Sequence, residues 1–160
     1  WKIEGRMKSP YYVAAVTRIY REALDRYFAD PVGYVYDQRW LSELEKVSHR
    51  EYGTGFFFGN QGYNSQTTHP GNLYIKEYDY LGMINNVLSD GVAEVLAKNR
   101  FLSNTPIEII GRRLSDDFSQ VLLDLRNEHN EPIEAAHAGQ KVLVKVSHPI
   151  HKYFILRKCG

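Results

Sequence analysis

The sequence has little cysteine and no long apolar run. Cys159 is the single cysteine among 160 residues, which excludes a disulfide framework or a cysteine-ligated iron–sulfur cluster within this chain. No apolar run approaches the length that crosses a membrane, so we expect a cytoplasmic protein with no membrane partner. An excess of one charge is also absent, since 20 Lys and Arg oppose 19 Asp and Glu. The chain therefore lacks the overall basic charge that is typical of nucleic-acid-binding proteins.

Sequence motifs of two common hydrolase types are absent too. The chain has neither the Gly-x-Ser-x-Gly nucleophile elbow nor the His-Glu-x-x-His pair of zinc proteases. His148 and His151 are spaced three residues apart, but Pro149 between them indicates a turn, and no third metal ligand stands nearby. We therefore expect no metal site and no nucleophilic catalysis in this chain.

A first helix is predicted from Ser9 to about Ala29. Ser9 is a favourable N-cap, and Pro10 suits the first helical position because that position needs no N–H donor. Apolar side chains at spacings of three and four residues predict one buried face, with charged residues on the opposite face. The predicted buried residues are Val13, Val16, Tyr20, Ala23, Leu24 and Tyr27, and the predicted exposed residues are Arg18, Glu22 and Arg26.

A second, shorter helix is predicted after Asp37, whose side chain can cap it. Its apolar residues again form one stripe, and its acidic residues are expected to face solvent. The stripe comprises Leu41, Leu44 and Val47, and the acidic residues are Glu43 and Glu45.

Residues 51–75 predict a long irregular connector. They are rich in Gly, aromatic residues, Asn and Thr, and they show neither helical nor strand periodicity. The three consecutive phenylalanines Phe56–Phe58 either form a stacking or docking surface or join the helices to the next domain. We favour the second interpretation, because large exposed apolar patches are rare on soluble proteins.

Short strands separated by turn signals follow the connector. Ser89-Asp90-Gly91 predicts a hairpin between the first two strands. Alternation of apolar and polar residues predicts that Val121, Leu123 and Leu125 share one face of a strand, and that Val142, Val144 and Val146 face inward on a later strand. The predicted strands are Tyr80–Leu88, Val92–Lys98, Ile107–Ile110, Phe118–Leu125, Lys141–Val146 and Tyr153–Leu156.

The predicted fold class is α+β, mostly β. Two N-terminal helices and the connector precede a small closed antiparallel β-barrel, since closure removes the exposed edges of an open sheet. The hairpin Ala138-Gly139-x-x-Val142 is similar to one in the barrel of translation factors, as in the second domain of elongation factor Tu. Residues 76–160 are expected to form this domain.

Four segments carry a resemblance to a known family. They are KIEGRMKSPYYVA from Lys2, YREALD from Tyr20, HREYGTGFFFG at His49–Gly59 and KNRF at Lys98–Phe101. Together they resemble the C-terminal region of the collagenase-like peptidase family (U32), in particular its tRNA-hydroxylating branch. Ile-Glu-Gly-Arg before Met7 is also the sequence that a cleavable fusion tag leaves behind, and the two origins are compatible.

The resemblance implies that residues 1–50 end an upstream (β/α)8 barrel, with Lys2–Gly5 as its last strand. Such enzymes place active groups at the C-terminal ends of barrel strands. Glu4 and Arg6 are therefore the expected catalytic residues of a longer protein, with Lys8 behind them, as general base and anion clamp. The alternative is that the two side chains simply pair with each other. With seven strands missing, this chain alone is expected to be inactive.

The family also suggests a substrate and a cofactor. Members are implicated in RNA hydroxylation, and relatives use an iron–sulfur cluster, which would lie in the missing catalytic part; this chain is expected to hold no cofactor. The C-terminal barrel would then position tRNA or another RNA for the upstream barrel. The candidate RNA-binding residues are Lys98, Arg100, Arg112, Arg113, Lys141 and Lys145.

Two other functions stay open. The barrel could present protein substrate to a collagenase-like peptidase. Alternatively, the chain could be a structural or oligomerising module that forms a homodimer through the apolar helix face of Val13, Val16, Tyr20 and Leu24. On the residues alone, the cations could equally belong to an ordinary surface of mixed charge, because acidic residues lie close to them in sequence.

Overall fold

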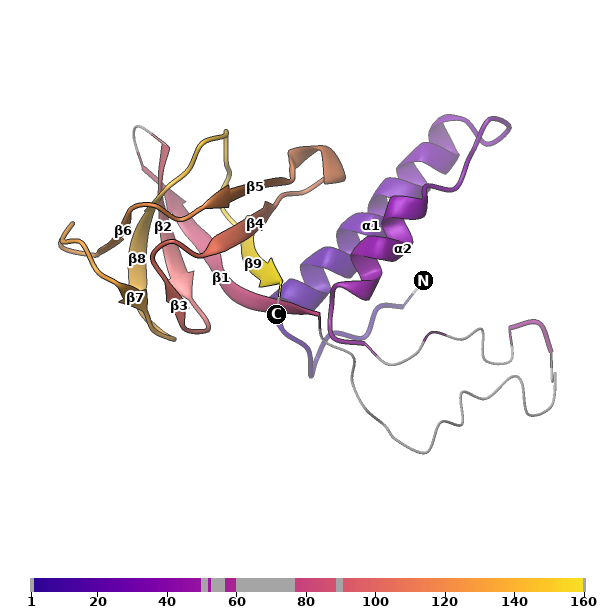
Figure 1. Ribbon diagram of the computed structural model, residues 1–160. Coiled ribbons are helices and arrows are strands. Elements are labelled where there is room, and N and C mark those ends of the chain that lie inside the picture. Colours follow the sequence, from indigo (N-terminus) through magenta and orange to yellow (C-terminus); the bar gives the residue numbers. More distant parts are fainter. Residues whose placement is uncertain (1, 50–51, 53–56, 60–76, 89–90, 160) are drawn as a thin grey trace.

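The computed structural model describes residues 2–49, 52, 57–59, 77–88 and 91–159. Helix α1 (Pro10–Ala29) is the longest element, and α2 (Gln38–Glu45) lies alongside it (Figure 1). The Ser9 hydroxyl accepts a hydrogen bond from the Tyr12 N–H at 3.2 Å, and the Asp37 carboxylate accepts one from the Arg39 N–H at 3.0 Å. Both predicted caps are thus confirmed.

The predicted faces of the two helices are partly wrong. Arg18 and Glu43, which we expected in solvent, are each only 7% exposed. Their charges are compensated in the interior because they form an ion pair with each other, and because Arg18 also binds Asp117 and Glu43 also binds Arg157. Val13 and Tyr20, expected to be buried, are 38% exposed. Other side chains expected to be buried but found exposed are Tyr27 and Leu41, whereas Val16 and Val47 are buried as predicted.

The strands form an antiparallel sheet that curves around a core (Figure 1). Its order is β5-β4-β9-β1-β2-β8-β6, and a separate two-stranded ladder pairs β3 with β7. The bounds are β1 Tyr78–Val87, β2 Val92–Ala97, β3 Phe101–Leu102, β4 Pro106–Ile110, β5 Phe118–Val121, β6 Leu125–Asn127, β7 Ala135–Ala136, β8 Lys141–Lys145 and β9 Ile155–Cys159. A short 3₁₀ turn, η3 (Leu114–Asp116), lies between β4 and β5.

One predicted strand is in fact two. The chain leaves β5 after Val121 and enters β6 at Leu125, and these strands lie at opposite edges of the sheet. The break occurs at Leu122, whose N–H and carbonyl bond to Thr105 and Asn104 in a loop rather than to a neighbouring strand. Leu122 is therefore buried, whereas Val121 and Leu123, which were expected to share a face with the buried Leu125, are exposed.

Closure of the barrel stays a prediction. Ladder pairing runs from β5 to β6, and none joins these two edges among the described strands. A side chain of β5 contacts the end of β8 instead. The Gln120 amide donates to the Lys145 carbonyl at 2.8 Å and accepts from the Ser147 N–H at 3.0 Å. The similarity to elongation factor Tu likewise stays a prediction.

Two apolar clusters organise the molecule. The larger one lies inside the curved sheet and includes Leu81, Val95, Ile109, Val142 and Leu156. The smaller one lies between α1 and the outer face of β1, β4 and β9 and consists of Tyr11, Ala15, Val16, Val47, Tyr80, Ile110 and Ile155. The helices therefore pack directly on the sheet.

Most of the predicted connector, including Phe56, lies outside the described residues. Phe57 and Phe58 are described, and they are 84% and 66% exposed. Their rings meet edge to face with centroids 5.0 Å apart, so they contact each other and stay exposed instead of joining the helices to the sheet. No helix in the described part of the chain has both the length and the hydropathy needed to cross a membrane.

Candidate nucleic-acid interface

A buried ion cluster joins both helices to the sheet. We define it as Arg18 of α1, Glu43 of α2, Glu108 of β4, Asp117 before β5 and Arg157 of β9. One Glu43 oxygen accepts from Arg18 Nη2 at 2.6 Å, and the other accepts from Arg157 Nη2 at 2.9 Å. Arg18 also binds both Asp117 oxygens, at 2.6 and 2.9 Å, and Arg157 binds Glu108 through Nη2 at 2.6 Å.

The electrostatics of this cluster follow from its burial. Burial by itself would raise the pKa of Glu43, but the hydrogen bond and charge of Arg157, together with Lys46 and Arg18, outweigh it and lower the pKa to about 2. Asp117 behaves in the opposite way, since burial raises its pKa despite the pairing with Arg18. Glu43 is therefore a fixed negative charge between two arginines.

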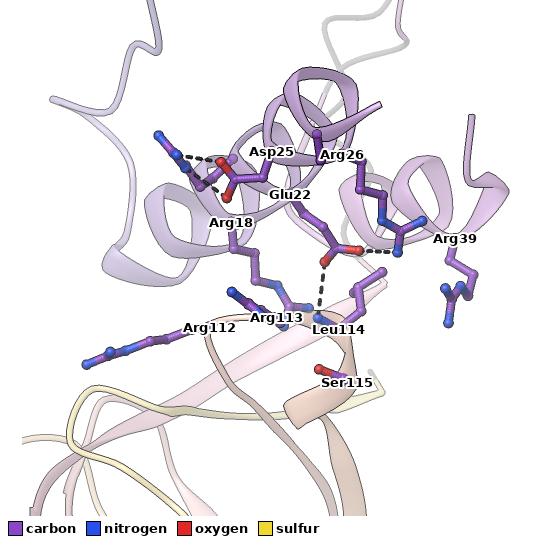
Figure 2. Close-up of a pocket in the computed structure, with 11 residues that line it drawn as sticks. Arg18, Glu22, Asp25, Arg26, Arg39, Arg112, Arg113, Leu114 and Ser115 are labelled. Atoms are coloured by element: carbon purple, nitrogen blue, oxygen red, sulfur yellow. Dashed lines mark hydrogen bonds and ion pairs between the residues drawn. The ribbon is translucent and has the colours of Figure 1, made fainter. Parts of the chain in front are cut away.

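Beside this cluster lies a cavity of about 560 Å³, which we call the arginine cavity (Figure 2). Helix α1 forms one wall, and the loop from β4 into η3 forms the other, with Arg39 of α2 at one end. Its lining residues are Arg18, Arg21, Glu22, Asp25, Arg26, Ala29, Arg39, Arg112, Arg113, Leu114 and Ser115.

The loop that carries Arg112 and Arg113 is held at both of its ends. Asp117 accepts a hydrogen bond from the Gly111 N–H at 3.0 Å, and Arg18 donates to the Gly111 carbonyl at 3.2 Å. A Cβ on Gly111 would come within 2.7 Å of the Phe154 ring, so this position requires glycine. The buried ion cluster thus fixes the loop that lines the cavity.

The arginines of the cavity differ in their pairing. Arg21 pairs with Asp25, Arg26 pairs with Glu22 and Asp37, and Arg39 pairs with Asp37. Arg112 and Arg113 are exposed, and no ion pair involves either of them within the described residues. Two unneutralised guanidinium groups beside a further row of arginines form a surface that suits phosphate groups.

The other predicted RNA-binding residues are not at this cavity. Lys98 and Arg100 are exposed after β2, and Lys141 begins β8 beside them, because Leu96 pairs with Lys141 in the ladder. Lys145 pairs with Val92 at the other end of β8, about 13 Å farther along at the usual rise per residue. The structure therefore divides the six predicted residues into two groups and one separate lysine.

The predicted catalytic residues Glu4 and Arg6 are both exposed. Residues 2–5 form no strand here, because the described residues offer them no neighbouring strand with which to pair. The predicted turn is present, with the Lys8 N–H donating to the Gly5 carbonyl at 3.0 Å. Glu4 pairs with Lys2 at 3.0 Å, not with Arg6. The catalytic roles of Glu4 and Arg6 remain predictions.

The histidines considered as metal ligands have other neighbours. His148 packs on Phe118 and contacts the Ser147 hydroxyl, and His151 packs on Phe154. Within the described residues, no group of three or more His, Cys, Asp or Glu side chains is arranged to hold a metal ion.

Sequence reasoning missed the arginines that α1 and α2 contribute to the cavity. It placed Arg18 and Arg26 on a solvent face and gave Arg21 and Arg39 no role. One signal was present: every basic residue between Pro10 and Glu45 is arginine, the side chain best suited to bidentate phosphate contacts.

Comparison with known proteins gives two family matches. Residues 1–67 match the family described as peptidase family U32, and residues 76–157 match the peptidase family U32 C-terminal domain. A solved C-terminal domain of a U32 peptidase from Geobacillus thermoleovorans is similar with a TM-score of 0.47 and 28% identity, covering 50% of this chain and 99% of that one.

Relatives that are named for a function match nearly all of the chain. The tRNA hydroxylation protein P1 of Bacillus subtilis is 34% identical over 98% of this chain, and the tRNA hydroxylation protein P of Haemophilus influenzae is 30% identical over 97%. A collagenase of Porphyromonas gingivalis is 28% identical over 94%. The chain spans only 37%, 33% and 41% of the lengths of these proteins, respectively.

Proposed function

Because the chain belongs to peptidase family U32, we propose that its helices and β-strands position RNA, and tRNA in particular, for hydroxylation by a catalytic part outside this chain. The relatives named tRNA hydroxylation proteins support this substrate class. Since the chain corresponds to about a third of their length, its own contribution is binding and orientation. Any iron–sulfur cluster would belong to the catalytic part.

The observation that carries the proposal is the arginine cavity. Arg112 and Arg113 protrude from a loop that the buried ion cluster holds in place, so their guanidinium groups are presented without an internal partner among the described residues. Guanidinium groups bind phosphate oxygens in pairs of hydrogen bonds. Such contacts orient a nucleic acid on a protein without reading its sequence.

The physical consequence is a binding free energy that depends on salt. Each phosphate that a cation neutralises releases condensed counterions, so the affinity falls as the salt concentration rises. A chain with almost no net charge has no general attraction for RNA, and therefore binding should depend on a few local arginines rather than on the whole surface.

The direct test is binding of the 160-residue chain to bulk tRNA at about 50 and about 200 mM salt. We expect salt-sensitive binding that Arg112→Glu and Arg113→Glu each weaken. Lys152→Glu is the matched control, because it makes the same change of charge on an exposed residue away from the cavity. The double variant Lys98→Glu/Arg100→Glu tests the second predicted group in the same assay.

The outcomes separate the candidate functions. Binding that the cavity variants weaken and the control leaves unchanged would support RNA positioning. Equal losses in all variants would mean non-specific charge attraction. No binding at the lower salt concentration would contradict the proposal and favour a domain that presents protein substrate, the alternative consistent with the relatives named collagenase.

A second candidate function, self-association, is favoured by an aromatic groove between α1 and α2. Tyr27, Phe28 and Tyr36 line this groove and are 46%, 74% and 54% exposed. The predicted homodimer face was different, and its member Val16 is buried against the sheet. If a second copy covers the groove, light scattering should give twice the mass of 18.5 kDa, and Phe28→Glu should restore the monomer. A monomeric wild-type chain would exclude this function.

A further inference from the structure

A second cavity, of about 540 Å³, lies at the N-terminal end of α1. It is bounded by the turn that precedes α1, by the start of β1 and by the loop after β2. Four tyrosines dominate its wall, and we call it the tyrosine cavity. Its lining residues are Met7, Lys8, Ser9, Tyr11, Tyr12, Ser48, Tyr78, Tyr80 and Asn99.

The tyrosine rings of this cavity are held in place. Tyr11 and Tyr80 stack with centroids 5.9 Å apart, and the Tyr11 hydroxyl donates to the Lys46 carbonyl and accepts from Arg157. Tyr12 is half-buried beneath the ammonium group of Lys8, which lies 5.0 Å from the ring centroid. Rigid aromatic rings that border a cavity suit a flat, unsaturated ligand, because stacking needs no induced fit of the rings.

Two polar groups of the cavity wall have unused hydrogen-bonding capacity. The Tyr80 hydroxyl is buried and has no hydrogen-bond partner among the described residues. The side-chain amide of Asn99 donates to the Tyr80 carbonyl at 2.6 Å, which leaves its amide oxygen able to accept. A ligand in the cavity can reach the exposed Asn99 side chain, whereas the Tyr80 hydroxyl has almost no accessible surface and stays without a partner among the described residues.

The charges around the cavity favour a ligand that carries negative charge beside its flat, unsaturated part. No Asp or Glu is among the described residues that line the cavity, whereas Lys8 is. Lys98 and Arg100 flank Asn99 in the same loop, and both are exposed. The cavity thus lies between the Gly5–Lys8 turn, where catalytic residues were predicted, and the second group of predicted RNA-binding residues.

We infer that the tyrosine cavity receives one unpaired nucleobase of an RNA, whose adjacent phosphates contact Lys98 and Arg100. This inference rests on the proposed function and adds to it the form of RNA that is bound. A base edge offers a donor for the Asn99 amide oxygen, and its face offers a stacking partner for Tyr12. A base within a duplex is paired and stacked already, so the cavity selects single-stranded loops.

The test uses two RNA hairpins of identical composition with one 5-iodouridine, placed in the loop of one and in the stem of the other. Each is bound to the 160-residue chain and irradiated, and the crosslinked residues are mapped by mass spectrometry. We expect crosslinks to Tyr12 or Tyr78 from the loop position and none from the stem position. Tyr12→Ala should weaken loop-hairpin binding about tenfold, as expected for the loss of one base-stacking partner.

Two controls separate this inference from the proposed function. Tyr153→Ala removes an exposed tyrosine elsewhere and should change neither binding nor crosslinking. A blunt RNA duplex without a loop should bind wild type and Tyr12→Ala equally through the arginines. Asn99→Ala, whose side chain lies at the surface, provides a second variant with little risk of misfolding.

Each outcome decides one of the two ideas. RNA binding that Tyr12→Ala and Asn99→Ala leave unchanged, or crosslinks that map outside the tyrosine cavity, would overturn the inference while the proposed function stands. Absence of binding to the hairpins and the duplex alike would overturn the proposed function, and the inference with it.

Discussion

Arg157 is a buried arginine in the middle of a β-strand, 1% exposed, and it contacts both helices. Its guanidinium group binds Glu43 of α2, Glu108 of β4 and the Tyr11 hydroxyl of α1, and it lies over the Tyr78 ring at 4.9 Å from the centroid. The sequence does not reveal this role, because Arg157 directly follows the predicted strand Tyr153–Leu156, and an arginine at the end of a strand is typically exposed. Only the position of the two helices over this strand makes it buried.

We predict that Arg157→Met lowers the free energy of unfolding by about 3–5 kcal/mol, as expected when one partner of a buried ion pair is removed. The loss arises because the Glu43 carboxylate keeps its buried position with fewer compensating donors. Chemical denaturation measures it. Lys158→Met on the same strand is the control and should cost less than about 1 kcal/mol, since Lys158 forms a loose pair at the surface. Equal losses in the two variants would contradict the role of the cluster.

Glu43 also predicts a pH dependence of stability. Its pKa falls from 4.5 to about 2 on folding, so the folded state favours the ionised form. The resulting stabilisation is complete above pH 4.5 and is lost as the pH falls toward 2. Denaturation midpoints measured across this range should fall in wild type and less in Glu43→Gln.

Asp117 provides a control of opposite sign. Burial raises its pKa above 3.8, so the folded state takes up a proton at higher pH than the unfolded state does. Its ionised form therefore opposes folding, and its contribution to stability grows as the pH falls. Asp117→Asn should steepen the acid loss, and a flatter profile in this variant would show that the sign is wrong.

At the scale of elements, the caps and the faces of one strand could be predicted from sequence, whereas the buried helix faces and the break at Leu122 could not. Ser9, Asp37 and the alternation of Val142 and Val144 involve neighbouring residues, which determine helix ends and strand faces locally. The break at Leu122 depends instead on a loop distant in sequence, which takes over its backbone hydrogen bonds. The buried face of α1 likewise depends on compensating charges from α2 and the sheet.

A glycine in β1 is predicted to be essential for the packing of two strands. A Cβ on Gly82 would lie 2.7 Å from the Leu96 carbonyl and 2.9 Å from a methyl of Val95. We expect Gly82→Ala to destabilise the protein by about 1–3 kcal/mol through overpacking. Asn86→Ala, on the same strand but exposed, should change the stability little. Thermal denaturation of both variants measures the change in stability, and a stabilised Gly82→Ala variant would contradict the prediction.

At the scale of the whole molecule, the candidate site combines what sequence could and could not indicate. Arg112 and Arg113 were identified because adjacent arginines after a strand are visible in the sequence. Their neighbours Arg21 and Arg39 were not, because a cavity between a helix and a loop about 90 residues away in sequence follows only from the fold. The sequence therefore indicates the chemistry, and the packing of α1 on the sheet assembles it.

We predict that helices and sheet unfold in one transition, since the buried ion cluster and the smaller apolar cluster join them. Tryptophan fluorescence, to which the buried Trp40 of α2 contributes, should report the same midpoint as calorimetry. The double variant Arg18→Met/Arg157→Met removes both arginine partners of Glu43 and should separate the two midpoints. Separate midpoints in wild type would show that the helices are an independent unit.

The burial of the ion cluster has a consequence for ionic strength. At about 0.15 M salt the Debye length is about 8 Å, and mobile ions then weaken attraction between exposed charges much more than attraction between buried ones. Arg112 and Arg113 are exposed to these ions, whereas Arg18 and Arg157 are not. Raising the salt concentration should therefore release a bound polyanion while the attachment of the helices to the sheet stays intact, so a salt titration reports on the ligand and leaves the geometry of its site unchanged.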